Sequence, residues 1–211
     1  FAELDINLTE NESYKSDLSF KLQKVSNDTF FRVHNINTTL VNSEDTDLEN
    51  SISYKLNGEN TYFDISATAY ENLRNKTNDR YEYILPNIMY GKTFFTEKFG
   101  TLNFTSNALY SKFETNRKKT FLTNDIIWSP SSRITKKGFK NSFEGMIRNT
   151  NYEARKTTEF KNKDRVNELN TVLTYKSSLP LQKVGDNYSK FFSPNFMFRY
   201  APGHMRNLSD E

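Results

Sequence analysis

The sequence contains no cysteine among its 211 residues, which excludes disulfide frameworks, cysteine zinc sites and thiol nucleophiles within it. Glycine and histidine are also scarce, with seven and two residues. No phosphate-binding glycine loop, serine-hydrolase motif or helical zinc-protease motif occurs. We therefore expect neither enzymatic activity nor a cofactor.

Long hydrophobic runs are missing as well. A membrane-spanning helix needs about 20 consecutive apolar residues, and the apolar stretch YEYILPNIMYG (81–91) is interrupted by Pro86. Hydrophobic residues make up only 35% of the chain, but aromatic residues make up 15%, which argues against plain disorder. The net charge of +3 is mild and gives no reason to expect nucleic acid as a partner.

What the sequence does contain is alternation with a period of two residues. In TYFDISATAY (61–70) and TLNFTSNALYSKF (101–113), apolar residues occupy one parity, and Asp, Ser, Thr or Asn occupy most of the other. The same rule predicts strands at 13–25, 28–36, 48–57, 61–71, 81–93, 99–113, 119–129, 138–149, 166–178 and 189–200.

Short and long connections roughly alternate between these strands. Compact turns are predicted at 56–61, 96–100 and 183–187, and longer polar links at 37–47, 72–80 and 150–165. Long alternating strands with this arrangement are typical of a transmembrane β-barrel. We predict an all-β, antiparallel, up-and-down barrel sheet, which forms an open curved sheet if isolated. A soluble β-sandwich or solenoid is the alternative interpretation of the alternation.

Candidate sites for ions are few. Asp45, Asp47 and Glu49 have a spacing like that of a calcium loop, but the glycine of such a loop is absent, so a solvated acidic loop is the favoured interpretation. The two histidines, His34 and His204, are far apart in the sequence and do not predict a metal site.

Two basic clusters are candidates for contacts with the phosphates of anionic lipids, and solvated turns are the alternative. The candidate residues are Arg117, Lys118, Lys119, Arg133, Lys136 and Lys137.

Four segments carry a family resemblance through their order and spacing: NDTFFRVHNI (27–36), LENSISYKLNGENTYFDISATAYENL (48–73), RYEYILPNIMYGKTFFTEKFGTLNFTSNALYSKF (80–113) and SPNFMFRYAPGHMRN (193–207). They resemble the LPS-assembly protein LptD family, also called the organic solvent tolerance protein family.

The resemblance implies an outer-membrane protein of a Gram-negative bacterium that inserts lipopolysaccharide (LPS) into the outer leaflet. The implied partners are LPS, a plug lipoprotein of the LptE type, outer-membrane lipid, and a periplasmic LPS-transport bridge that docks on an N-terminal jellyroll. We expect residues 1–211 to form one partial barrel domain that lacks the jellyroll and the gate strands. Another outer-membrane channel or receptor and a soluble β-rich adhesin or binding module are the alternatives.

On this interpretation the two parities face different surroundings. The residues predicted to face the lumen are Asp64, Ser66, Thr68, Asn87, Asn103, Thr105 and Asn107. The residues predicted to face lipid are Phe63, Ile65, Ala67, Ile84, Pro86, Ile88, Leu102 and Phe104. Because proline has no N–H for the sheet ladder, we also predict a gap or bulge at Pro86.

Overall fold

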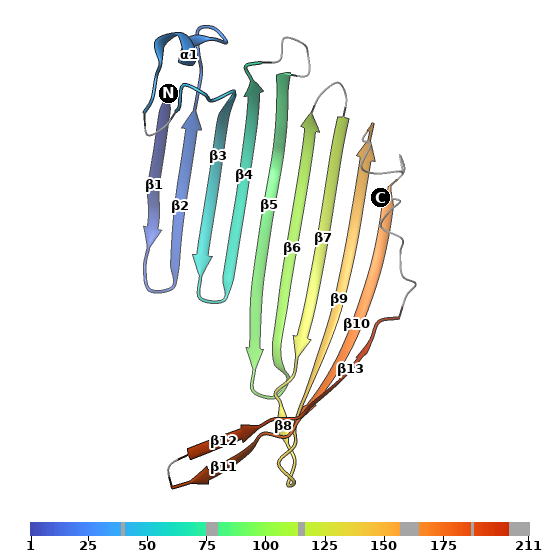
Figure 1. Cartoon of the computed structure of the whole chain (residues 1–211). Coiled ribbons are helices and arrows are strands. Elements are labelled where there is room, and N and C mark those ends of the chain that lie inside the picture. Colours follow the sequence, from blue (N-terminus) through green and yellow to red (C-terminus); the bar gives the residue numbers. More distant parts are fainter. Residues whose placement is uncertain (39–40, 75–79, 114–116, 157–164, 187, 203–211) are drawn as a thin grey trace.

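One curved antiparallel sheet of eleven strands dominates the structure (Figure 1). The structure is a computed structural model and describes residues 1–38, 41–74, 80–113, 117–156, 165–186 and 188–202. The strands follow one another across the sheet in the order β1 (Ala2–Glu10), β2 (Tyr14–Leu22), β3 (Asp47–Gly58), β4 (Thr61–Asn72), β5 (Tyr81–Thr96), β6 (Gly100–Phe113), β7 (Arg117–Ser129), β9 (Lys140–Arg155), β10 (Val166–Ser178) and β13 (Asn195–Tyr200).

The connectivity is up-and-down, because nearly every strand pairs with the next one along the chain. The short strand β8 (Arg133–Ile134) adds to β9, and β11 (Leu181–Gly185) and β12 (Tyr188–Phe192) form a separate hairpin at one end of the sheet (Figure 1). The predicted all-β, antiparallel, up-and-down fold is confirmed. The sheet is open, with β1 and β13 as its two edges.

The predicted strand at 28–36 is wrong, since this segment contains the helix α1 (Phe30–His34). The side chain of Asn27 accepts hydrogen bonds from the Thr29 N–H and hydroxyl, at 3.1 and 3.0 Å. Asn35 ends the helix in the left-handed conformation, at φ 46°. These local turns at asparagine outweigh the strand preference of the aromatic residues between them.

Other strands also differ from prediction, and the short strands β8 and β11 were not predicted. Strand β1 was not predicted, although Leu4, Ile6 and Leu8 alternate there with polar residues. Strand β9 continues to Arg155, where a link was expected from residue 150. The predicted strand 189–200 is divided into β12 and β13 by Ser193 and Pro194, because proline cannot donate to a ladder.

A small hydrophobic cluster closes the end of the sheet that carries α1. Its buried members are Phe31, Val41, Leu48 and Leu73. Arg80 ties the same end together, because it donates hydrogen bonds to Asp28 at 2.7 Å and to Glu71 at 2.8 Å. Both hydrogen bonds raise the pKa of the Arg80 guanidinium, and the one to Asp28 has the larger effect. Arg80, directly before β5, thereby connects Asp28 of the β2–β3 link with Glu71 of β4.

The predicted irregularity at Pro86 is confirmed as a bulge in β5. Ile65 of β4 lies opposite Ile88, and Thr68 lies opposite Ile84. Leu85 and Pro86, joined by a cis peptide bond, therefore stand together opposite Ala67 alone. Two residues against one is the arrangement of a β-bulge.

The bulge inverts the faces of β5 on its two sides, and this corrects one prediction. Ile84 lies opposite Thr68 and Ser111 on the polar face, and does not share a face with Ile88. Tyr83, instead, is on the side of Ile88. The prediction for Ile84 is wrong because the extra residue in the bulge shifts the side-chain alternation by one, and Pro86 lies within the bulge itself.

A tyrosine ring covers a glycine of the neighbouring strand at several places in the structure. Tyr62 lies opposite Gly91, and a Cβ atom on Gly91 would overlap the Tyr62 ring. Tyr14 covers Gly58 in the same way, with Cε1 only 2.7 Å from the position of a Cβ atom. Close approach to a ring, rather than turn geometry, explains these glycines.

We predict that Gly91→Val lowers the free energy of unfolding by about 1–3 kcal/mol, because the new side chain displaces the Tyr62 ring. Gly145→Ala is the matched control, since a Cβ atom there lies at 3.6 Å from Leu173 and 3.8 Å from Trp128. Heat-dependent gel migration and urea unfolding of the full-length protein in detergent measure both variants. Equal stability of the two would contradict the prediction.

Candidate functional site

The strand register brings apolar side chains onto one face of the sheet, here called the apolar face. Directly opposed residues in antiparallel strands point to the same side. One row across the sheet consists of Leu18, Tyr54, Ile65, Ile88, Ala108 and Leu122. Another, nearer the β5–β6 turn, consists of Phe94, Leu102, Trp128, Gly145, Leu173 and Tyr200.

The apolar face is uncovered. Phe143 and Leu173 expose 57% and 53% of their surface, and Phe198 exposes 58%. In the part of the chain that the structure describes, neither a helix nor a second sheet is layered on this face (Figure 1). Such a continuous exposed apolar surface marks contact with something other than water.

The apolar residues form a belt that crosses the sheet at a slant. On β4 the belt comprises the outward residues of 63–69, and on β10 those of 169–175. These two sets share a single row, which runs through Phe63, Tyr90, Ser106, Asn124, Asn149 and Leu169. From this row the belt extends toward the α1 end of the sheet on β4, and toward the opposite end on β10, because the two strands run in opposite directions. The belt is therefore displaced by six residues between β4 and β10, toward the end of the sheet that carries the β3–β4 and β5–β6 turns. Where Ser106 and Asn124 interrupt it, their side chains hydrogen-bond to each other at 2.7 Å.

The opposite face, here called the polar face, carries the second parity. One of its rows consists of Lys55, Asp64, Met89, Asn107, Thr123, Thr150 and Glu168. The residues predicted for the lumen all share this face: Asp64, Ser66, Thr68, Asn87, Asn103, Thr105 and Asn107. Of those predicted for lipid, the apolar face holds Phe63, Ile65, Ala67, Ile88, Leu102 and Phe104. Which surroundings each face meets stays a prediction.

An ion pair on the polar face joins β7 to β9. Arg148 donates two hydrogen bonds to Asp125, from Nε to Oδ1 and from Nη2 to Oδ2, each at 2.7 Å. Asp125 is only 9% exposed, so the guanidinium supplies the partner that a buried carboxylate requires. The sequence analysis did not select either residue. Their position on the polar parity of two predicted strands was the available signal.

A second group of charges surrounds Glu153 near the end of β9. Its carboxylate lies 2.7 Å from Arg155, 3.0 Å from Arg165 and 3.6 Å from Lys118. Lys118, one of the predicted lipid-contact residues, is thus paired within the protein. Glu153 itself is buried, whereas the side chains of Arg155 and Arg165 are exposed.

The family comparison agrees with this two-faced sheet. The family model for LptD, described as LPS transport system D, matches residues 4–209. The chain belongs to the LptD family. No individual curated protein is similar enough to match it. The resemblance seen in the sequence is confirmed. The matched residues include nearly all of the sheet, and so the side chains of both its faces.

The two basic clusters of this LptD-family chain lie at opposite ends of the sheet. Arg117, Lys118 and Lys119 are the first residues of β7, whereas Arg133, Lys136 and Lys137 belong to the β7–β9 link at the other end (Figure 1). The sequence alone did not show that the two clusters lie at opposite ends of the sheet. In a membrane, the two clusters would meet different leaflets.

The acidic loop of the LptD-family chain uses its carboxylates separately. Asp45 accepts the Asn42 N–H at 2.7 Å, Asp47 accepts the Asn72 side chain at 2.7 Å, and Glu49 pairs with Lys21 at 2.9 Å. No group of three potential metal ligands occurs among the described residues.

The remaining expectations concern histidine and helices. The His34 ring is tilted against the Phe30 ring, with centroids 4.8 Å apart. His204 lies outside the described residues. Within the described ranges, no helix has the length and apolar character needed to cross a membrane.

We predict that Arg148→Gln destabilises the protein by about 1–3 kcal/mol, because Asp125 loses its charge-assisted partner inside the sheet. Arg148→Lys keeps the charge but not the two parallel hydrogen bonds, so its stability should fall between those of Arg148→Gln and the unaltered protein. Urea unfolding in detergent micelles, followed by tryptophan fluorescence, measures the series. A Gln variant as stable as the unaltered protein would show that the pair is dispensable.

Proposed function

We propose that this sheet is part of the wall of an outer-membrane β-barrel that delivers LPS to the outer leaflet of a Gram-negative bacterium. The observation that carries the proposal is the uncovered apolar face backed by a polar face, in a chain of the LPS transport system D family. The apolar face meets lipid and the polar face meets the lumen. The wall itself performs no catalysis.

The slant of the apolar belt supports contact with a bilayer. Barrel strands tilt about 35–45° from the membrane normal, and neighbouring strands lie about 4.8 Å apart. Across the five strand spacings from β4 to β10, about 24 Å, a flat bilayer should therefore shift by about 5–7 residues along the strands. The belt shifts by six. A soluble sandwich has no reason for this slant and needs a second layer on the apolar face.

The polar face suits the hydrophilic part of a glycolipid. Asn103, Thr105 and Asn107 present amide and hydroxyl groups that can donate and accept hydrogen bonds to sugars. Acyl chains find no apolar surface on this face. In the proposed function they pass laterally into the membrane between strands that lie outside this sheet. We further propose that residues 1–211 are one partial barrel domain, and that its partners are the plug lipoprotein of the LptE type and a periplasmic LPS-transport bridge.

We predict that Ile147→Lys prevents assembly in the outer membrane, whereas Met146→Lys is tolerated. The two residues are adjacent in β9 but lie on opposite faces, since Ile147 is opposite Ile126 and Met146 is opposite Ile127. A lysine facing the bilayer midplane costs about 2–4 kcal/mol. Heat-dependent gel migration of outer-membrane fractions measures assembly. Equal assembly of both variants would overturn the assignment of faces.

We also predict that a photo-crosslinking amino acid at Thr105 captures LPS in living cells, whereas one at Phe104 captures phospholipid. These neighbours in β6 again point to opposite faces. Crosslinked products are separated on gels and stained with an antibody against LPS. Absence of LPS from Thr105 and its presence at Phe104 would place the transport route outside the proposed lumen. No LPS at either position, with normal assembly, would favour another kind of outer-membrane channel.

A further inference from the structure

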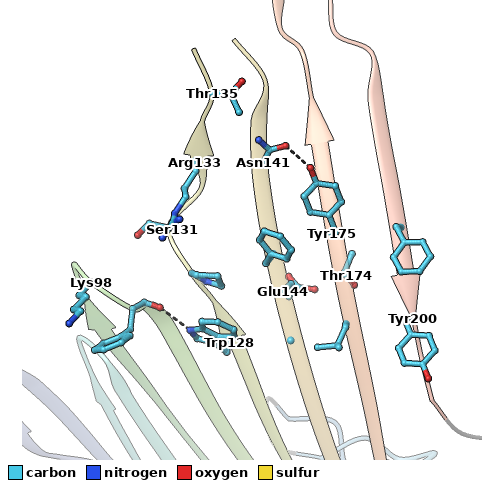
Figure 2. A pocket seen from close by; sticks show the side chains of 16 residues that line it. Lys98, Trp128, Ser131, Arg133, Thr135, Asn141, Glu144, Thr174, Tyr175 and Tyr200 are labelled. Carbon is cyan, nitrogen blue, oxygen red and sulfur yellow. Dashed lines mark hydrogen bonds between the residues drawn. The ribbon is translucent and has the colours of Figure 1, made fainter. Parts of the chain in front are cut away.

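The apolar face is hollowed at one end, near the β5–β6 turn. The hollow has a volume of about 1020 Å³. Its apolar lining includes Phe99, Trp128, Phe143, Leu173, Phe198 and Tyr200. Figure 2 shows Trp128 and Lys98 on one side of the hollow, and Tyr175 and Tyr200 on the other.

Gly145 lines the hollow and stands in the row between Trp128 and Leu173. The position of a Cβ atom on Gly145 is 3.6 Å from Leu173 and 3.8 Å from Trp128, so a larger side chain would occupy the space between them. The Trp128 indole is held in place at the rim, since its Nε1–H donates to the Phe99 carbonyl oxygen at 2.8 Å.

The rim of the hollow is cationic. Lys98 and Arg133 both line it, and Figure 2 shows Arg133 and Ser131 toward the end of the sheet. Among the residues that the structure describes, no ion pair involves either cation. The carboxylate among the lining residues belongs to Glu144, which lies opposite Thr174 and so is on the polar face.

We propose that this hollow binds an anionic phospholipid of the surrounding bilayer, with an acyl chain over Gly145 and the phosphate between Lys98 and Arg133. The inference rests on the proposed function, because it requires the apolar face to meet lipid. Trp and Tyr side chains are enriched at the level of the lipid headgroups, and Trp128 stands on the side of the hollow that carries the cationic rim. Arg binds phosphate as a fork and Lys as a point charge.

A phospholipid fits this site better than LPS does. LPS in the proposed function travels along the polar face, whereas the hollow opens on the apolar face. The hollow offers an apolar floor for hydrocarbon and has two cations, Lys98 and Arg133, among its lining residues. Its volume is at the upper end of ordinary ligand sites, about 300–1,000 Å³.

The test uses the full-length protein, purified in detergent, stripped of lipid and then given equal amounts of phosphatidylglycerol and phosphatidylcholine. Native mass spectrometry measures how much of each lipid is retained. We expect one phosphatidylglycerol to be retained in preference by about three- to tenfold, and Lys98→Gln/Arg133→Gln to abolish the preference. Lys136→Gln/Lys137→Gln is the matched control, which removes two charges from the same β7–β9 link but not from the lining, and it should keep the preference.

Gly145→Leu tests the acyl-chain part of the site and should reduce retention of both lipids. If that variant does not assemble, the charge variants decide alone. Equal retention of the two lipids by the unaltered protein, an equal loss in the control, or preferential retention of added LPS would overturn the proposal. Failure of the proposed function is distinguishable, because Ile147→Lys would then assemble normally, whereas failure of the lipid site alone leaves that variant defective.

Discussion

Hydrogen bonding between neighbouring strands is the interaction on which the rest of this structure depends. From β1 to β10 each strand pairs with the next, so each inner strand is paired on both sides, with interruptions at bulges such as the one in β5. In hydrocarbon, a backbone N–H or C=O group finds no water, so a lipid-exposed wall must satisfy its main chain internally. Only a fully paired sheet can therefore leave side chains such as Phe143 and Leu173 uncovered without exposing polar backbone beside them. A soluble protein of this size would instead bury such residues under a second layer.

Side-chain alternation adds a second constraint, because a strand has only two faces. The two halves of β5 are out of step, with Tyr81 and Tyr83 before the proline and Ile88 and Tyr90 after it. A regular strand would turn one half of these aromatic and aliphatic residues toward the polar face. The bulge at Leu85 and Pro86 absorbs one residue and returns both halves to the apolar face. A residue type that disfavours a sheet thus allows this strand to keep its faces consistent.

Much of the sheet could be predicted from the sequence, because alternation is a local pattern. It predicted most strands and the separation of Asp64 from Ile65 onto different faces. It failed at α1, where the Asn27 side chain accepts hydrogen bonds from Thr29 and stabilises a local turn. It also indicated an irregularity at Pro86 without showing which half of β5 is inverted.

Contacts that depend on the register of distant strands could not be predicted in this way. The pairing of Asp125 with Arg148 requires the alignment of β7 with β9 across the link 130–139, and the length of a link does not determine that alignment. The same alignment places Gly145 between Trp128 and Leu173. The hollow therefore depends on the register of the strands, and predicting the strands alone does not predict it.

The slanted belt also has a consequence for the size of the opening that such a wall encloses. A displacement of six residues over five strand spacings corresponds to a tilt of about 40°. At that tilt each strand occupies about 6.3 Å of circumference instead of about 4.8 Å. The ten strands of the main path then span about 63 Å of perimeter, against about 48 Å for upright strands. Leaning the strands therefore widens the wall without adding strands, and each strand must be about 1.3 times as long to cross the same thickness.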